Sequence, residues 1–224
     1  MRVTFSPLSA TDETIALSSG GSLWMRRLDW WCDGVRLRLQ VIGLERIDLP
    51  EAEPSEPVPG ALARVVGALR GSGALLALLD PASALGMGRV LYAEGVRLFG
   101  IATPADEACW DEALSAGRPI YGLRGTIACE LVRPSPASAI AALAYGAFTC
   151  EEGLSPTLLE EDRAGVRWRF PAETDATVII RGGFEAARSA GASGEWRDRG
   201  GEGYVRVAFA SPAGRCWTQP RFVA

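Results

Sequence analysis

The chain of 224 residues contains no histidine, no lysine and no asparagine. A protein without histidine cannot use imidazole as a metal ligand or as a general base. Long apolar runs are missing too, since none approaches the roughly 20 residues that a membrane helix needs. Residues 1–10 also lack the basic start and the apolar centre of a signal peptide. We therefore expect a cytoplasmic protein with no membrane partner.

Paired cysteines are also absent. The five cysteines are odd in number and widely spaced, and no Cys-x-x-Cys pair occurs, so the sequence predicts neither a zinc site nor a disulfide framework. We expect buried, reduced thiols, because free cysteine packs as a small hydrophobic residue. The formal net charge of -4 gives no electrostatic reason to expect nucleic acid as a partner.

The residues that are present predict a globular protein with a sizeable core. Hydrophobic residues make up 48% and charged residues 22% of the chain, and the length fits one large domain or one domain with a small appendage. The first clear pattern is a hairpin at 22–43, in which two apolar-rich runs flank Asp33-Gly34, a strong turn signal. A short strand is expected before it, near residues 2–5.

Residues 60–150 repeat one unit four times in loose form: a helix rich in alanine and leucine, a glycine stop and a short apolar strand. Strands that alternate with helices and carry nearly continuous apolar runs predict a parallel sheet covered by helices, either closed into a barrel or open. A proline-rich surface loop, 50–59, precedes the repeats. The expected helices are 60–70, 82–93, 105–116 and 136–145, and the expected strands are 74–79, 96–101, 118–123 and 147–150.

After Gly153 the helical period disappears. Apolar and polar residues alternate over 166–170 and 205–209, and glycine-rich turns separate these runs. This pattern predicts a small antiparallel sheet or sandwich. We therefore divide the chain into an α/β domain over 1–152, with the hairpin as an unusual start, and a β module over 153–224.

Polar side chains follow the predicted parallel strands at their carboxyl ends, where the functional groups of such sheets lie. Asp80 ends one strand, and Arg124, Thr126 and Glu130 occupy the expected loop 124–130 after another. Arg124 could hold a phosphate or carboxylate, and Asp80 and Glu130 could give oxygen ligands to Mg²⁺ or Mn²⁺. The alternatives are an exposed loop arginine and carboxylates that are merely solvated.

A motif at 110–122 reads WDEALSAGRPIYG and is similar to the pattern W-D-x-L-L-x-x-G-R-x-V-Y-G of the polymerase and histidinol phosphatase (PHP) superfamily. Residues 137–149 resemble the family segment A-I-x-A-L-x-x-G-x-F-Y, and the tail 204–220 resembles the last hairpin of the family's β module. The resemblance implies an α/β fold: a truncated or distorted, TIM-barrel-like (βα) barrel followed by a small antiparallel β-sandwich-like module.

The resemblance also has consequences for chemistry. PHP enzymes bind two or three divalent metals through histidines and carboxylates and hydrolyse phosphoesters, but the family's Ala-His-Pro stands here as Leu79-Asp80-Pro81, and Gly-Thr-Ile-Ala-Cys-Glu at 125–130 replaces its Asp-x-His loop. The resemblance therefore implies a pseudoenzyme with no catalytic residue, metal site or cofactor, which serves as a binding or assembly module for a small anion or a protein. The alternative is a divergent phosphoesterase that binds Mg²⁺ or Mn²⁺ through carboxylates alone.

Overall fold

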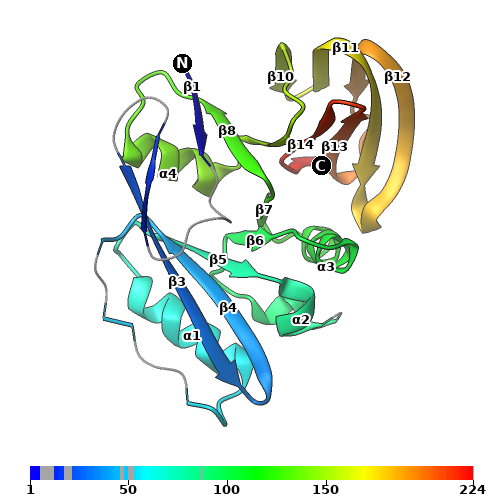
Figure 1. Cartoon of the computed structure of the whole chain (residues 1–224). Helices are drawn as coiled ribbons and strands as arrows, with labels where there is room; N and C mark the ends of the chain where they lie inside the picture. The colour runs from blue at the N-terminus through cyan, green and yellow to red at the C-terminus, as the bar shows by residue number, and fades with distance from the viewer. Residues whose placement is uncertain (6–12, 18–21, 46–47, 50–52, 87, 224) are drawn as a thin grey trace.

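The computed structural model describes residues 1–5, 13–17, 22–45, 48–49, 53–86 and 88–223. In this part of the chain the strands form two sheets, which we call sheet A and sheet B, and four α-helices accompany them. Strands account for 48% of the structure and helices for 22%. Figure 1 shows sheet B in the lower half of the molecule with three of the helices, and the curled sheet A above it.

Sheet B changes from antiparallel to parallel pairing part of the way across. Strands β2 to β5 are antiparallel neighbours, whereas β5, β6 and β7 are parallel. The predicted hairpin is confirmed: Asp33 and Gly34 connect β3 to β4 with φ angles of 49° and 73°, the positive values that an Asp-Gly turn adopts. In order across the sheet, the strands are β2 (Glu13–Ala16), β3 (Ser22–Cys32), β4 (Val35–Ile42), β5 (Leu75–Leu79), β6 (Leu98–Gly100) and β7 (Tyr121–Leu123).

Three helices connect the strands of sheet B. Proline occupies the first turn of each helix, where its missing N–H costs no hydrogen bond. A capping box closes the start of the third, because Thr103 and Asp106 accept each other's backbone N–H groups. The helix predicted over 82–93 is wrong beyond Leu85, since Gly86 leaves the helix with a φ of 69°. The helices are α1 (Val58–Leu69), α2 (Pro81–Leu85) and α3 (Pro104–Ser115), and a 3-10 turn at Val90–Tyr92 follows α2.

Sheet A pairs its strands antiparallel and curls into a half-barrel (Figure 1). Its strands come from both sides of residue 152, because β8 and β9 pair with each other and β9 then pairs with β14. The predicted helix α4 (Pro136–Tyr145) is confirmed and joins β8 to β9. Across the sheet the order is β1 (Arg2–Phe5), β8 (Thr126–Glu130), β9 (Thr149–Glu152), β14 (Gly214–Thr218), β13 (Gly203–Ser211), β11 (Gly165–Ile180) and β10 (Leu158–Asp162), with β12 (Phe184–Arg197) on β11 and β15 (Arg221–Val223) on β13.

Strand β5 shows how the layers are built, because its two faces enter different cores. Leu76 and Leu78 pack with the side chains of α1, α2 and α3, whereas Leu75, Ala77 and Leu79 pack on the opposite face toward sheet A and α4. All five residues are buried. A continuous apolar run thus indicates that both faces of the strand are covered. We expected helices on both faces of β5, but sheet A and helix α4 cover the second face.

A third core fills one end of the curl of sheet A. The ring of Phe209 lies 5.5 Å from that of Trp168 and 4.8 Å from that of Phe170, measured between centroids. Val207 and Cys216 pack in the same cluster. These side chains fill the half-barrel beside β11 and β13, while the end beside β1 and β8 stays open.

The resemblance to the PHP superfamily is wrong, and so is the TIM-barrel-like α/β fold that it implied. The structure is mainly β, with a large curled antiparallel sheet, and its described helices and strands do not follow a (βα) barrel pattern. The physical reason lies directly after β7, where Gly125 turns the chain out of sheet B with a φ of 54°. Residues 126–130, predicted as a loop, form β8, and the expected fourth parallel strand becomes β9 in sheet A.

Candidate functional site

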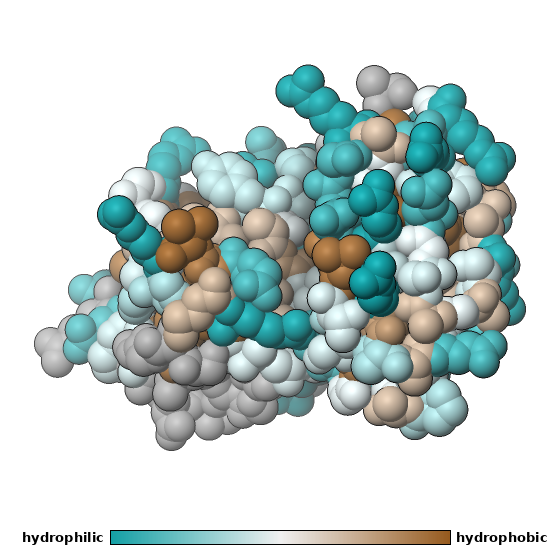
Figure 2. Space-filling view, turned by 90° about the horizontal axis from the view of Figure 1, so that it is seen from above, coloured by the Kyte–Doolittle hydropathy of each residue, from teal (hydrophilic) through white to brown (hydrophobic). Residues whose placement is uncertain are grey.

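The open end of the half-barrel forms a pocket of about 680 Å³ between β8 and β10. Its floor continues the concave face of sheet A, and the end of α4 and the start of β1 contribute to its rim. Seen from above, the pocket is the hollow between the part of the molecule that contains α4 and the part that contains β10 (Figure 2). Its volume is typical of sites that bind small molecules or single side chains.

Glu161, on β10, lines this pocket with a carboxylate that can bind a ligand. It lies opposite Val166 in the β10–β11 pair, and directly opposed residues share one face of a sheet. Since Val166 is buried in the core of the half-barrel, Glu161 points to the concave side. Among the described residues, no hydrogen bond or ion pair engages its carboxylate.

The carboxyl of Glu161 is also poorly hydrated for its position. Desolvation by the surrounding chain raises its pKa to about 7, against the opposite effect of the positive charge of Arg221. The residue as a whole keeps an exposed surface, so water screens part of this effect. Glu161 therefore holds a proton more readily than an ordinary glutamate does.

The two arginines that line the pocket are already paired. Arg221 donates two hydrogen bonds to Asp198, at 2.5 and 2.7 Å. Arg2 forms an ion pair with the buried carboxylate of Glu151. Because each arginine already has its own carboxylate, neither is available to neutralise Glu161 fully.

The remaining walls of the pocket are largely apolar. Leu159 lies on β10 two residues before Glu161 and packs against the core of the half-barrel. Pro156 and Ala128 contribute from the two sides, and Tyr145 stands at the end of α4 with 80% of its surface exposed. A carboxylate beside apolar walls fits a ligand that carries a cation on an aliphatic stem.

The predicted site residue Asp80 lies elsewhere, at the end of β5. It forms an ion pair with Arg38, whose strand β4 is the antiparallel neighbour of β5. The φ of Asp80 is 51°, a left-handed value that is unusual for a residue other than glycine. Its carboxylate is thus held within sheet B and does not line the pocket.

The other three predicted residues lie along sheet A. Arg124 donates its Nε to Glu152 at 3.2 Å, and its guanidinium lies 4.3 Å from the ring centroid of Trp217. Thr126 begins β8. Glu130 ends this strand, lines the pocket and lies 3.7 Å from the amino terminus. Of the four predicted residues, Glu130 alone therefore belongs to the pocket, and the four do not form one cleft.

A second charged cluster joins sheet A to helix α3, which packs on sheet B. Arg206 of β13 is 2% exposed and donates its Nε and Nη2 to Asp111 of α3 at 3.0 and 2.8 Å. It also forms an ion pair with Glu107 at 2.9 Å and lies 4.8 Å from the ring centroid of Trp110. The hydroxyl of Tyr204 donates to Asp111 at 2.6 Å. We call these residues the interface cluster.

The electrostatics of the interface cluster favour the charged form of its arginine. Burial acts to lower the pKa of Arg206, but the hydrogen bonds and negative charge of Asp111 and Glu107 outweigh burial and raise it. Burial and the bond to Asp111 raise the pKa of Tyr204, so its hydroxyl stays a donor. The cluster therefore holds a fixed cation between two carboxylates.

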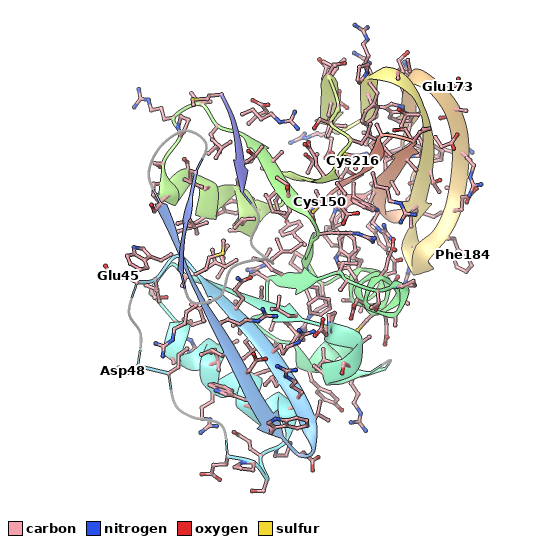
Figure 3. The ribbon with its side chains drawn as sticks, viewed as in Figure 1. Glu45, Asp48, Cys150, Glu173, Phe184 and Cys216 are labelled. Carbon is pink, nitrogen blue, oxygen red and sulfur yellow. The ribbon has the colours of Figure 1, made fainter. Side chains whose placement is uncertain are left out.

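The cysteines are free and buried, as predicted. Burial raises the pKa of Cys129 to about 11 and that of Cys150 to about 12, so reactive thiolates are scarce at neutral pH. Figure 3 shows Cys150 where the two sheets meet and Cys216 within the curl of sheet A. Within the described ranges, no group of three or more aspartate, glutamate or cysteine residues could hold a metal ion.

Known proteins offer no guide to this pocket. No family model matches the chain, and neither a curated protein nor a solved structure is similar to it. In the described part of the chain, no helix is both long enough and apolar enough to cross a membrane. The functional interpretation therefore depends on the geometry and charge of the pocket.

Sequence analysis missed Glu161, although the chain carries one usable signal. The run LLEED at Leu158–Asp162 contains no apolar alternation and therefore does not read as a strand. The short turn after it is fixed by Asp162, whose carboxylate accepts the N–H groups of Ala164 and Gly165. A hairpin about this turn places Glu161 opposite the apolar Val166, which identifies its inward face.

Proposed function

We propose that the protein is a binding module that holds a positively charged group of its ligand against Glu161. The observation that carries this proposal is a carboxyl group on the concave side of the half-barrel that takes part in no hydrogen bond or ion pair with the described residues. A partly desolvated charge is costly unless it is paired. Because Arg2 and Arg221 already have partners, a ligand cation is the natural complement.

The walls favour a ligand whose charge stands at the end of an aliphatic stem. Leu159 and Pro156 offer apolar surface beside Glu161, which the methylene groups of an amine or guanidine can cover. The charged end gains a charge-assisted hydrogen bond, which is stronger than a neutral one. Lysine side chains, arginine side chains and alkyl amines have this structure.

The sequence predicted a binding module for a small anion, whereas the ligand proposed here carries a positive charge. The expected anion site depended on Arg124, but Glu152 and Trp217 already hold its guanidinium. An anion in the pocket would meet Glu130 and Glu161, and like charges repel. The arrangement thus supports a cationic ligand better than a phosphate or carboxylate.

An NMR titration with three small ligands tests the proposal. Acetyl-lysine methylamide and acetyl-arginine methylamide carry the charge, and acetyl-norleucine methylamide is their neutral control. We expect both charged ligands to shift the amide signals of β8 and β10 and to bind about tenfold more tightly than the neutral one, the equivalent of one charge-assisted hydrogen bond. Equal binding of all three, or no binding, would contradict the proposal.

A pair of neighbouring variants assigns the effect to the pocket. Glu161→Gln should lower the affinity for both charged ligands about tenfold. Glu160→Gln is the matched control, because Glu160 precedes it on the same strand but pairs with Arg167 at 3.0 Å on the other face. An equal loss in both variants would indicate a general charge effect and no specific site.

A further inference from the structure

We infer that the ligand of this pocket is an extended, basic segment of a partner protein, which adds a strand to the free edge of β10 and places a lysine or arginine side chain against Glu161. This inference rests on the function proposed above. It names the class of ligand and the backbone contacts that hold it. Three features of β10 support it: its edge position, the spacing of its inward side chains and its charge.

The first feature is the position of β10 at the edge of sheet A. Strand β10 ends the order of sheet A, and among the described residues it pairs with β11 alone. Its other edge therefore offers backbone N–H and C=O groups to another chain. Figure 1 shows β10 at the end of the curl, and its residues line the pocket that faces β8. An extended peptide commonly binds such an edge through main-chain hydrogen bonds.

The spacing of the inward side chains adds sequence preference. Leu159 and Glu161 are two residues apart on one strand, so both point to the concave side. An added strand has the same period of two. In antiparallel pairing, the arrangement found throughout sheet A, the residue opposite Glu161 is followed two positions later by the residue opposite Leu159. The structure thus favours a segment of the form basic-x-apolar.

The charge of β10 argues against a second copy of this chain as the occupant. The strand ends in three consecutive acidic residues, Glu160, Glu161 and Asp162. Antiparallel pairing of two β10 strands would gather six acidic residues in one strand pair. In register about Glu160 it would also set the two Glu160 side chains directly opposite each other, which is destabilising. A basic segment of a different protein has the complementary charge.

A set of four peptides tests the inference on the full chain. The parent is acetyl-Thr-Lys-Thr-Val-Thr-amide, and in the first control the valine directly follows the lysine. Two further peptides carry N-methyl groups, one on the lysine and valine amides and the other on the threonine amides, because alternate amides of a strand point to the same edge. Affinities are measured by NMR titration, with acetyl-lysine methylamide as the reference ligand.

We expect the parent to bind about tenfold more tightly than the reference ligand, since its backbone forms further hydrogen bonds with β10. The respaced control should lose most of this gain. One N-methylated peptide should lose it and the other should keep it, because one set of amides faces β10. Hydrogen exchange of amides in β10 should slow when the parent binds.

Other results would overturn the inference in distinct ways. If the parent binds no better than acetyl-lysine methylamide, or if both N-methylated peptides behave alike, strand addition is wrong while the cation site stands. If the reference ligand also fails to bind, the proposed function is wrong as well. A dimer in sedimentation velocity that dissociates in Glu161→Gln would identify a second copy as the occupant and overturn the inference.

Discussion

The interface cluster and the pocket use carboxylates in opposite ways. In the cluster, Asp111 receives hydrogen bonds from Arg206 and Tyr204, and Glu107 adds a second negative charge beside the same guanidinium. In the pocket, Glu161 has no such partner among the described residues. The difference suggests that the first set of charges holds the sheets together, whereas the second is left for a ligand.

Position in the sheet accounts for this difference. Arg206 lies on β13, between β11 and β14, and its side chain is almost fully buried against α3. A charge in that place is tolerated only if the fold supplies its partner. Glu161 lies on the end strand β10, where water lowers the cost of an open charge. The largest effects of substitution are therefore expected in the cluster and the smallest at exposed ion pairs.

The largest effect should follow Asp111→Ala. This change leaves the guanidinium of Arg206 and the hydroxyl of Tyr204 buried without their acceptor, and removal of one partner from a buried ion pair costs about 3–5 kcal/mol. Urea unfolding should show this loss. The double variant Asp111→Leu with Arg206→Met should recover most of it, because both charges are removed together. A loss below about 1 kcal/mol would mean that the cluster does not hold the sheets together.

A smaller loss is expected at Gln219, the second polar link between the sheets. Its side-chain amide donates to the carbonyl of Gly122 at 3.0 Å and accepts that residue's N–H at 2.8 Å, so it completes the edge of β7. Gln219→Leu leaves the buried N–H of Gly122 without a partner and leaves its carbonyl with the weak thiol donor of Cys150 alone, which should cost about 2 kcal/mol. Hydrogen exchange of the Gly122 amide should rise in this variant. An unchanged rate would show that water replaces the glutamine.

The sequence predicted local structure well where a few neighbouring residues determine the backbone conformation. The Asp33-Gly34 turn and helix α4 follow from turn and capping chemistry, which depends on a few neighbouring residues. The apolar run of β5 correctly indicated two buried faces. It could not show what covers them, because a sheet and a layer of helices bury the same leucines equally well.

Long-range pairing explains the errors. The alternation of Thr126–Glu130, with Ile127 and Cys129 buried, is too short to be distinguished from a loop. Strand β12 is rich in alanine, serine and glycine and shows no apolar period. Glu161 is a candidate site residue because β10 and β8 line the same pocket, and no local sequence pattern encodes this contact between distant segments.

The open charge of the pocket should make ligand binding depend on pH. Because desolvation raises the pKa of Glu161 to about 7, a proton competes with the cation below that value. Affinity for acetyl-lysine methylamide should fall below pH 7 and level off about tenfold lower, at the affinity of the neutral Glu161→Gln variant. The facing side chains of Arg2 and Arg221 stay charged over this range. Glu161→Gln should flatten the profile, and a slope that persists in this variant would contradict the assignment to Glu161.

The same group should affect folding in the opposite sense to ligand binding. A carboxyl whose pKa is raised in the folded state contributes stability below its ordinary value of 4.5, and this contribution is lost as the pH rises through about 7. Near pH 8, Glu161→Gln should therefore be at least as stable as the natural chain. Asp111→Ala should remain less stable than the natural chain at that pH. This result would distinguish the structural charge of Asp111 from the ligand-binding charge of Glu161.

The smallest effect is expected at Arg124, the residue from which the sequence predicted an anion site. Its ion pair with Glu152 and its stacking over Trp217 are partly exposed, and contacts of these kinds contribute about 0.5–1 kcal/mol each at such sites. Arg124→Ala should lower the free energy of unfolding by about 1 kcal/mol and leave the affinity for acetyl-lysine methylamide unchanged. Inorganic phosphate provides the decisive comparison. If phosphate stabilises the natural chain against unfolding but does not stabilise the variant, then Arg124 binds an anion. Its charge would then serve a ligand, which would contradict its assignment as a structural charge.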